Sequence, residues 1–303
     1  MKTTAEQPFI FENISDLMRR LEQPKPLHPL VALVRYGSIK VNVADVGQRF
    51  ALNFYKISFK IDFKGQVRYG QGYYDFEEGG LAFLAPNQIV TAYEQEKTYE
   101  GYTFFFHPDF IRNYPLGKRI HTYGFFSYAV SEALFLSEKE KFVIASVFNH
   151  IALELENNID QFSQDVMVSQ IELLLNYSNR FYHRQFITRK TLHNEWLEQM
   201  NSYLAERLDN AVLSGLPNAQ ELADYLKVSP RYLTDMLKTL TGQNTQQYIH
   251  TLLMEKAKDM LSLSQLNISE IAYKLGFEHP QSFHKLFKQK MGMSPVAFRQ
   301  SFE

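Results

Sequence analysis

Ala219–Leu240 reads AQELADYLKVSPRYLTDMLKTL, and its apolar residues follow two short helical periods. Ser229 and Pro230 separate the two periods as an N-cap and a first helical residue, which predicts that a second helix begins there. The residues expected to face inward are Leu222, Ala223, Leu226, Leu233, Met236 and Leu237. The pattern predicts a helix-turn-helix unit.

The same pattern occurs again in Asn267–Lys290, NISEIAYKLGFEHPQSFHKLFKQK, with Gly276 in the turn. Ala223 and Ala272 occupy matching positions about 49 residues apart, where we expect the two helices of each unit to approach closely. The inward residues expected here are Ile268, Ile271, Ala272, Leu275, Phe283, Leu286 and Phe287. One such unit is imitated by ordinary core helix pairs, but two copies joined by a helical stretch, Thr245–Leu263, favour a tandem helix-turn-helix domain.

Charge is unevenly distributed along the chain. Residues 226–303 carry ten Lys and Arg against six Asp and Glu, a balance of +4, while the rest of the chain has a balance of −5. A basic end on a protein of net charge −1 indicates an anionic partner there. A solvated protein face would carry such charge too, so the charge alone leaves both interpretations open.

Ile268–Arg299 resembles the second DNA-binding motif of the AraC/XylS-type bacterial transcription regulators. The shared features are IA-x3-GF, then F-x2-LFK, then G-x-SP-x2-FR, and the resemblance covers roughly residues 195–303. Thr241-Gly242, followed by Tyr248-Ile249, matches the first motif in the same order. The N-terminal strands are similar, more loosely, to the cupin-like sensor domain of arabinose-responsive members, through their arrangement and the segment GGLAFLAPNQ.

This resemblance implies that Pro230–Thr239 and Pro280–Lys290 are reading helices that enter two successive major grooves, about one helical turn (roughly 34 Å) apart. Outward-facing side chains on these helices are the candidates for DNA contacts. They are Arg231, Thr234, Asp235, Lys238, Gln281, Ser282, His284, Lys285 and Lys288. Each position is also compatible with a solvated side chain that touches no base.

Residue chemistry suggests roles for several of these candidates. Arg231 suits guanine, Thr234 suits a thymine methyl group, and Lys238 suits a phosphate. Asp235 departs from the family, which often has a basic residue at this position. Its carboxylate would accept a hydrogen bond from cytosine N4 or repel a phosphate. On the second helix, Gln281 suits adenine, and Lys285 suits guanine or phosphate.

Residues 30–106 have the short alternating segments of β-strands. We expect strands at Leu52–Ile61, Val67–Tyr74, Leu81–Leu84, Ile89–Tyr93 and Tyr99–Phe106, with turns at Gly65-Gln66, Glu77–Gly80 and Glu94–Lys97. Strands at this spacing predict a sandwich or small barrel. Aromatic residues that would fill its interior or line a pocket are Phe54, Phe59, Tyr69, Tyr73, Phe83, Tyr93, Tyr102 and Phe104.

An antiparallel helix pair, or one helix with a break, is predicted between the strands and the C-terminal units. Ser137 and Glu140 form a capping box that opens the first helix, and Asn157-Asn158 weakens it. Its apolar stripe is Ile144, Phe148, Ile151 and Leu155, and the second stripe is Ile171, Leu174, Ser178 and Phe181. Such stripes either pack on the barrel or form a dimer seam, and we expect a homodimer through these helices.

Other chemistries find little support in the sequence. The chain has no Cys, which excludes disulfides and thiolate metal sites, and its nine His show no HxH or HExxH spacing. Gly70-Gln71-Gly72 lacks the later Gly and Lys of a phosphate-binding loop. We therefore expect no catalytic residues, no metal and no cofactor.

The first residues lack the apolar run of a signal peptide, and no apolar stretch is long enough to span a bilayer, which predicts a cytoplasmic protein without membrane contact.

Together these features predict an α+β protein of three parts: a cupin-like sensor barrel (1–116), a helical linker and dimerisation segment (117–190), and a tandem helix-turn-helix domain (191–303). The expected function is a regulator of transcription, an activator, that binds double-stranded promoter DNA. A small-molecule effector in the barrel and a contact with RNA polymerase fit this function. Two alternatives stay open: a cupin-type enzyme, and a regulator whose barrel makes protein contacts alone.

Overall fold

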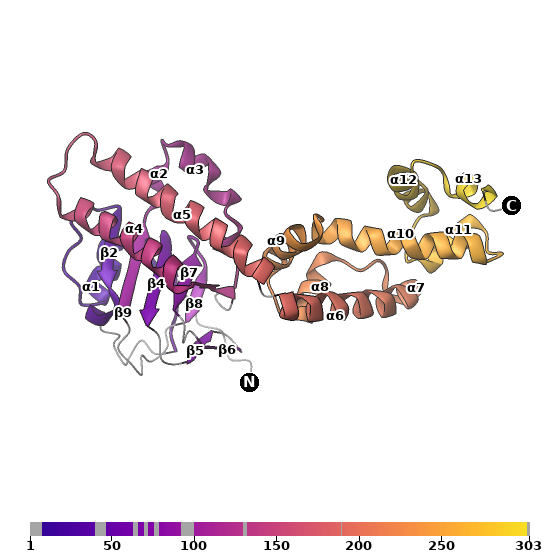
Figure 1. Ribbon diagram of the computed structural model, residues 1–303, viewed down its shortest axis with the longest axis horizontal. Coiled ribbons are helices and arrows are strands. Elements are labelled where there is room, and N and C mark those ends of the chain that lie inside the picture. Colours follow the sequence, from indigo (N-terminus) through magenta and orange to yellow (C-terminus); the bar gives the residue numbers. More distant parts are fainter. Residues whose placement is uncertain are drawn as a thin grey trace. The chain divides into compact units, whose positions relative to one another are not determined.

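The structure is a computed structural model that describes residues 8–39, 47–62, 66–69, 72–75, 79–91, 100–129, 132–188 and 190–301. Its contacts divide the chain into two compact units, Met1–Gln185 and Phe186–Glu303. The first unit combines sheets and helices, and the second is helical, so the fold is of the mixed α+β type (Figure 1).

The first unit is built on sheets whose strands are mostly antiparallel. Their bounds are β1 (Phe9–Phe11), β2 (Val31–Arg35), β3 (Arg49–Leu52), β4 (Tyr55–Asp62), β5 (Gln66–Tyr69), β6 (Gly72–Asp75), β7 (Gly80–Leu84), β8 (Ile89–Thr91), β9 (Glu100–Phe106) and β10 (Leu134–Phe135). They form one five-stranded sheet in the order β10-β7-β4-β9-β2, a second sheet β1-β3-β8, and the pair β5-β6. Among the residues that the structure describes, these sheets do not close into one barrel, so the cupin-like barrel is not confirmed.

Two of the predicted strands are divided in the structure. The prediction of one strand over Leu52–Ile61 is wrong, because β3 ends at Leu52 and β4 begins in the other sheet at Tyr55. Phe54 fills the core between them with none of its surface exposed. Val67–Tyr74 is likewise not one strand, since β5 and β6 pair antiparallel with Tyr69 opposite Gly72.

The other strand predictions agree with the structure apart from their ends. β7, β8 and β9 lie within a residue or two of the predicted Leu81–Leu84, Ile89–Tyr93 and Tyr99–Phe106. Tyr93 and the turn at Glu94–Lys97 lie outside the described residues, as do Gly65 of the first predicted turn and Glu77 and Glu78 of the turn at Glu77–Gly80.

Helices cover one face of the five-stranded sheet (Figure 1). The helices that begin in this unit are α1 (Ile14–Arg20), α2 (Pro108–Ile111), α3 (Pro115–Arg119), α4 (Glu138–Glu156) and α5 (Ser163–Thr188), and short 3-10 turns lie at Tyr36–Ser38, Ile120–Thr122 and Gly124–Ser127. The predicted capping box is present, since the Ser137 amide donates to Glu140 at 2.8 Å and the Glu140 amide donates to the Ser137 hydroxyl at 3.4 Å.

The apolar stripe of α4 packs on the unit's own sheet. Ile144, Phe148 and Ile151 are completely buried, and the Phe148 ring stacks on Phe59 at 5.3 Å and on Tyr102 at 5.7 Å. The stripe of α5 is buried in the same way at Ile171, Leu174, Ser178 and Phe181. These residues therefore stabilise one chain and are not available as a seam between two, and a homodimer would need other residues of the two helices.

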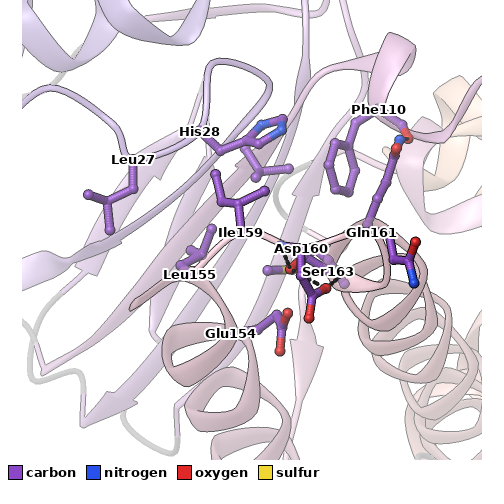
Figure 2. Close-up of a pocket in the computed structure, with 12 residues that line it drawn as sticks. Leu27, His28, Phe110, Glu154, Leu155, Ile159, Asp160, Gln161 and Ser163 are labelled. Carbon is purple, nitrogen blue, oxygen red and sulfur yellow. Dashed lines mark hydrogen bonds between the residues drawn. The ribbon is translucent and has the colours of Figure 1, made fainter. Parts of the chain in front are cut away.

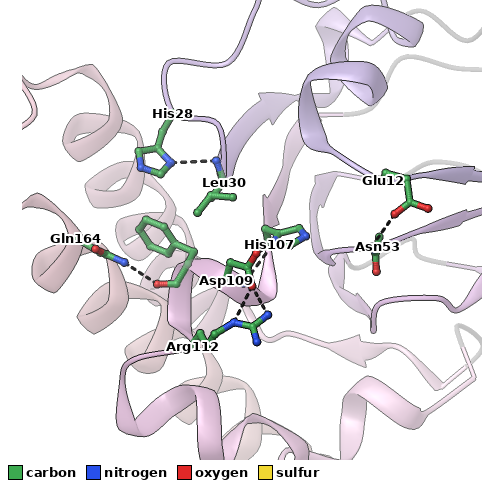
Figure 3. Close-up of polar contacts among 9 residues, drawn as sticks. Glu12, His28, Leu30, Asn53, His107, Asp109, Arg112 and Gln164 are labelled. Atoms are coloured by element: carbon green, nitrogen blue, oxygen red, sulfur yellow. Dashed lines mark hydrogen bonds and ion pairs between the residues drawn. The ribbon is translucent and has the colours of Figure 1, made fainter.

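Polar side chains hold the segment that follows β9 (Figure 3). His107 caps α2 by accepting the Asp109 amide at 3.2 Å, and Arg112 Nε donates to Asp109 at 2.7 Å. Gln164 of α5 donates to the Phe110 carbonyl at 2.8 Å, which ties α5 to α2.

The second unit consists of helices joined by short turns. They are α6 (Lys190–Asp209), α7 (Ala211–Ser214), α8 (Ala219–Leu226), α9 (Pro230–Thr241), α10 (Thr245–Leu263), α11 (Ile268–Lys274), α12 (Pro280–Met291) and α13 (Pro295–Gln300). The pairs α8–α9 and α11–α12 are the two predicted helix-turn-helix units, and α10 contacts both.

Candidate DNA interface

The first helix-turn-helix unit is fixed by its caps and its apolar face. Asn218 caps α8 by accepting the Glu221 amide at 3.0 Å, and the Ser229 hydroxyl caps α9 by accepting the Tyr232 amide at 3.2 Å, with Pro230 next to it as predicted. All the residues expected to face inward are buried: Leu222, Ala223, Leu226, Leu233, Met236 and Leu237.

The turns of the two units have the same backbone geometry. Lys227 ends α8 with a left-handed φ of 58°, and the Val228 amide donates to the Ala223 carbonyl at 3.0 Å. In the second unit Gly276 has a φ of 89°, and the Phe277 amide donates to the Ala272 carbonyl at the same distance. Ala223 and Ala272 have no exposed surface, so the alanines stand where each pair of helices makes its close approach.

The second unit shares one apolar core with α10. This core cluster includes Leu253, Ala257, Ile271, Phe283 and Phe287 among its buried members, with Leu286 packed on its edge. Of the residues expected to face inward in this unit, Ile268 and Leu286 are partly buried and the others are fully buried.

The motif segment G-x-SP-x2-FR, Gly292–Arg299, has a structural role in the second unit. Gly292 ends α12 with a φ of 74°, and the Ser294 hydroxyl caps α13 by accepting the Ala297 amide at 3.1 Å. Phe298 packs on the Phe287 ring at 5.5 Å, and Arg299 Nε donates to the Leu261 carbonyl at 3.1 Å at the end of α10. This part of the sequence motif therefore joins α13 to the core and does not face outward as a binding surface.

The candidate contacts of α9 are divided between solvent and the protein itself. Arg231 and Lys238 are exposed, as predicted. Asp235 accepts from Arg231 Nε at 3.0 Å, so the departure from the family pattern holds the guanidinium of the neighbouring candidate. Thr234 is half-buried, and its hydroxyl shares a hydrogen bond of 2.9 Å with Thr245, which leaves its methyl group as the part able to meet a base.

The candidate contacts of α12 are more open. Gln281, Ser282, Lys285 and Lys288 are exposed, while His284 is half-buried. Within the described residues, no hydrogen bond or ion pair holds the side chains of Gln281, Lys285 or Lys288. These three are therefore available to a ligand without the loss of an existing polar contact.

A comparison of matching positions shows that α9 and α12 carry different charges. Lys238 and Lys288 match one another, as do Thr234 and His284, but Asp235 of α9 corresponds to Lys285 of α12. The second unit thus presents two lysines at positions where the first presents one lysine and one carboxylate. We expect the second unit to bind a polyanion more strongly.

Sequence reasoning left out some exposed cations beside these helices. Lys227 is exposed at the turn before α9, and Lys290 is exposed near the end of α12. The charge of Lys290, together with burial as the larger cause, lowers the pKa of His250. An alignment of the two copies would have identified Lys227 as a turn residue, because it stands at the position that Gly276 occupies in the second copy.

A separate hollow of about 290 Å³ lies in the first unit (Figure 2). Its walls include the apolar side chains of Leu27, Phe110 and Leu155, and carboxylates stand at Glu154 and Asp160. The Phe162 amide donates to Asp160 and holds its pKa below the usual value, so this rim carries negative charge. His28 on the same wall accepts the Leu30 amide at 3.0 Å, and burial lowers its pKa.

Two further features were searched for in the described part of the chain. There, no three His, Asp or Glu side chains gather closely enough to hold a metal ion. The described helices include none with the length and apolar character that crossing a membrane requires.

Comparison with known proteins agrees with the repeat in the second unit. A family described as a helix-turn-helix domain matches residues 222–301. The chain is 30% identical over 139 residues to the HTH-type transcriptional activator RhaS of Escherichia coli, which is 46% of this chain and 46% of RhaS. The chain thus spans about half the length of the curated relatives that it matches.

Two solved structures show likeness to the second unit of this chain. The C-terminal domain of the two-component response regulator yesN from Fusobacterium nucleatum is 29% identical, with 34% of this chain and 95% of that chain covered and a TM-score of 0.31. A transcriptional regulator with an AraC-type DNA-binding domain from Chromobacterium violaceum is 19% identical, with 37% and 96% covered and a TM-score of 0.33.

The C-terminal unit is therefore a tandem helix-turn-helix domain, of the class that DNA-binding transcription regulators carry. The match to RhaS, which covers 46% of each chain, agrees with the resemblance to AraC/XylS-type regulators that the motifs of this domain carry.

Proposed function

We propose that the protein is a sequence-specific DNA-binding regulator of transcription and acts as an activator. The observation that carries the proposal is the pair of matching helix-turn-helix units, each with an exposed lysine at the same place on its second helix, Lys238 and Lys288. The activator role is taken from the name of the relative RhaS. RNA polymerase is then the expected protein partner at a promoter.

The proposed base and phosphate contacts follow from exposure and residue chemistry. Lys238, Lys285 and Lys288 meet phosphates, Gln281 reads adenine, and Arg231 reads guanine once it leaves Asp235. The remaining proposed contacts are Thr234 through its methyl group, Ser282 and His284. Because phosphate binding releases counterions, the affinity for duplex DNA should fall steeply as salt rises.

The test is fluorescence anisotropy of the full chain with a duplex obtained by selection from random sequence. Lys288→Ala should weaken binding to selected and unselected duplexes alike and should lower the salt slope by about one unit. Gln281→Ala should instead relax the preference at one base position, at about 1–3 kcal/mol if both amide atoms contact the base.

Lys139→Ala is the matched control, because Lys139 is an exposed lysine on α4 of the first unit. Its affinity and salt slope should equal those of the wild type. Binding that ignores salt, or an unchanged base preference in Gln281→Ala, contradicts the assignment.

Asp235 supplies a second test of the same surface. Asp235→Lys should raise the affinity for any duplex, because it makes α9 resemble α12 and releases Arg231. The reverse change in the second unit, Lys285→Asp, should lower it. If both variants bind as the wild type does, these helix faces do not meet DNA.

For the rest of the chain we propose the division expected from sequence: a cupin-like sensor part (1–116), a helical linker (117–190) and the DNA-binding part (191–303). A small molecule bound by the first part would favour one arrangement of the protein through its differential affinity for two states. Thermal stability of the full chain in metabolite mixtures is the first test of such an effector.

We also propose a homodimer that uses the outward faces of α4 and α5. These faces expose Phe142 (78%), Leu153 (59%) and Leu173 (41%), while the stripes on the opposite faces are buried in the unit's own core. Light scattering should give a dimer at micromolar concentration and a folded monomer for Phe142→Asp combined with Leu153→Asp. A monomeric wild type contradicts the proposal.

A further inference from the structure

The hollow of about 290 Å³ lies at the surface, where the connection between α4 and α5 meets the start of β2 and the helix α2 (Figure 2). The buried part of its lining is apolar and consists of Val31, Phe110 and Met167. The open part is apolar too, since Leu27 is 68% exposed and Ile159 71% exposed. Large apolar side chains that gather in solvent around one hollow mark a site of interaction.

The size of the hollow suits one side chain better than a whole small-molecule ligand. Small-molecule pockets bury most of their ligand and have volumes of about 300–1,000 Å³, so this hollow lies just below their range. Its exposed rim also leaves it open to solvent. A hollow of this kind accepts a single anchor side chain from a protein segment that lies across the rim.

The charge around the hollow is negative. Residues 142–179 contain five Asp or Glu and no Lys or Arg. Glu154 lines the hollow and is half-buried, and within the described residues no hydrogen bond or ion pair holds its carboxylate. Asp160 lines it as well, and no Lys or Arg in the described part of the chain pairs with this carboxylate. The two carboxylates are therefore complementary to a partner that supplies a cation.

Hydrogen bonds hold the lining in place without a partner. Asp160 accepts from the Phe162 amide at 2.8 Å and from the Ser163 amide at 2.9 Å, which fixes the connection where α5 begins. Gln164 donates to the Phe110 carbonyl at 2.8 Å, and this bond joins two of the elements that line the hollow (Figure 3). Because the lining is already ordered, binding costs little conformational entropy on this side of the interface.

His28 adds a neutral donor to the same lining. Its Nδ1 accepts the Leu30 amide at 3.0 Å, so the neutral ring carries its proton on Nε2. Burial lowers the pKa of His28, which keeps the ring neutral at pH 7 and leaves the negative charge of the two carboxylates uncompensated. The ring packs edge-on against Phe110, with 5.2 Å between the ring centres. Nε2 is then the atom that can donate to a backbone carbonyl of a bound segment.

We propose that this hollow is the docking site for a segment of a partner protein in which a lysine or arginine stands beside a large apolar residue. The apolar side chain enters the hollow against Phe110, Leu155 and Ile159, and the cation pairs with Glu154 and Asp160. Charge complementarity selects this occupant, since a neutral or acidic segment would leave both carboxylates without a cation. The site adds a partner surface to the proposed function and does not depend on it.

The test is selection of short peptides from a random library on the immobilised full chain, followed by fluorescence anisotropy of the enriched peptide at pH 7. We expect enrichment of sequences that place a lysine or arginine next to leucine, isoleucine, methionine or an aromatic residue. Replacement of that cation by glutamine in the peptide should weaken binding at least tenfold. Absence of an enriched sequence overturns the proposal, as does an enriched sequence without a cation.

Variants assign the binding to the hollow. Glu154→Gln keeps the size of the side chain and removes its charge, so it should weaken the peptide severalfold, and Ile159→Ser should weaken it at least tenfold. Glu156→Gln is the matched control, because Glu156 is an exposed carboxylate of the same helix outside the lining, and it should bind as the wild type does. Circular dichroism verifies that each variant is folded. Peptide binding unchanged in both Glu154→Gln and Ile159→Ser overturns the proposal.

Two further measurements distinguish other occupants. Isopentylamine has a cation and an apolar group without a peptide backbone, and it should bind at least tenfold more weakly than the peptide. Equal affinity would mean a small-molecule site and overturn the proposal. Light scattering should give the same oligomeric state for Ile159→Ser and for the wild type. A dimeric wild type that becomes monomeric in this variant would mean that a second copy of the chain covers the hollow, which also overturns the proposal.

Discussion

At the scale of single residues, the two copies of the helix-turn-helix unit place different residue types at the left-handed position of the turn. Both turns need a left-handed residue, and the first uses Lys227 where the second uses Gly276. Glycine has no Cβ to resist this conformation, whereas Lys227 accepts a cost of about 1–2 kcal/mol. The use of glycine in the second turn indicates a second requirement, because a side chain at position 276 would have little room beside its neighbours.

Gly276→Ala should destabilise the second unit by more than the backbone cost alone. A Cβ there would lie 3.0 Å from the Ala211 Cβ and 3.0 Å from the Gly215 carbonyl carbon, so it adds overpacking of about 1–3 kcal/mol. Urea unfolding followed by fluorescence of Trp196, the single tryptophan of the chain, reports this unit.

Gly292→Ala is the matched control for that experiment. Gly292 has a φ of 74°, but no atom lies within 4 Å of the position of its added Cβ. The free energy of unfolding of Gly292→Ala should fall by about 1–2 kcal/mol, from the backbone conformation alone. Equal losses for the two variants would mean that the contact of Gly276 with α7 is unimportant.

Lys60 should make the stability of the first unit rise with pH. Its pKa is about 7 in the folded protein against 10.5 as the ordinary value, so the unfolded chain binds more protons between these limits. Unfolding then takes up a proton, and the free energy of unfolding increases as pH rises from 7 towards 10.5, by at most about 1.4 kcal/mol per pH unit. Calorimetry between pH 7.5 and 9 measures this slope.

The variant Lys60→Met should have a shallower slope over the same range, because the lowered pKa of this lysine no longer contributes. Lys139→Met, at an exposed position, should keep the slope of the wild type. Identical slopes in all three proteins would contradict the burial of a titrating Lys60.

At the scale of elements, the amphipathic helices are the best predicted part of the fold. α4 has the predicted capping box, and it ends at Glu156, just before the weakening Asn157-Asn158. Its buried stripe contacts the sheet, and its opposite face exposes Phe142 at 78%. One aromatic residue of α4 therefore contributes to the core, and another does not.

Phe148→Ala should destabilise the first unit by about 3–5 kcal/mol, because it removes a fully buried ring that stacks on two others. Phe142→Ala should change the stability of the isolated protomer by less than about 0.5 kcal/mol. Chemical unfolding at low protein concentration measures both. A large loss for Phe142→Ala would show that its face is covered, as the proposed dimer requires at higher concentration.

The strands were harder to predict than the helices, for physical reasons that particular residues show. Asn53 continues an alternating run, but its side chain donates to Glu12 at 2.8 Å and its amide to the Phe11 carbonyl, so the chain changes sheets there. Such a change depends on contacts with residues about forty positions away, which periodicity does not contain. Likewise, alternation alone would place Lys60 on a solvated face of its strand, but Lys60 is only 7% exposed.

The second helix of each motif, α9 and α12, was predicted from sequence, but the hydrogen bonds and ion pairs of their side chains were not. Apolar spacing identifies the inward residues of α9, and it leaves Arg231, Thr234, Asp235 and Lys238 facing outward. The bond between Thr234 and Thr245 and the ion pair of Arg231 with Asp235 depend on rotamers and on the position of α10. The sequence therefore predicts which side chains of α9 face outward. It does not predict which of them already form hydrogen bonds or ion pairs within the protein.

At the scale of the whole molecule, the described contacts form two units with separate cores. Phe186, near the end of α5, belongs to the second unit, where it is 3% exposed and packs edge-on against Tyr232 at 5.1 Å. The last residues of α5 thus contribute to the core of the second unit, upstream of the boundary expected near Lys190.

A fragment of residues 186–303 should consequently be more stable than a fragment of residues 192–303. Both should fold and bind duplex DNA, and the longer one should gain about 3–5 kcal/mol from burial of Phe186. Phe186→Ala in the longer fragment should bring its urea midpoint down to that of the shorter fragment. Equal midpoints for the two unmodified fragments would place Phe186 outside the unit.

The helix α10 has a consequence for the kind of operator that the proposed function would use. It runs without a break from its capping box at Asn244 to Leu263, about 28 Å along its axis, with Thr245 bonded to α9 and Ala257 in the core of the second unit. An α-helix turns by about 100° with each residue, so the number of residues in α10 sets the phase of one motif against the other. A single residue inserted between Ile249 and Leu253 would rotate one motif around the axis relative to its neighbour. The altered protein would then prefer operators whose two contacted segments lie on different sides of the duplex.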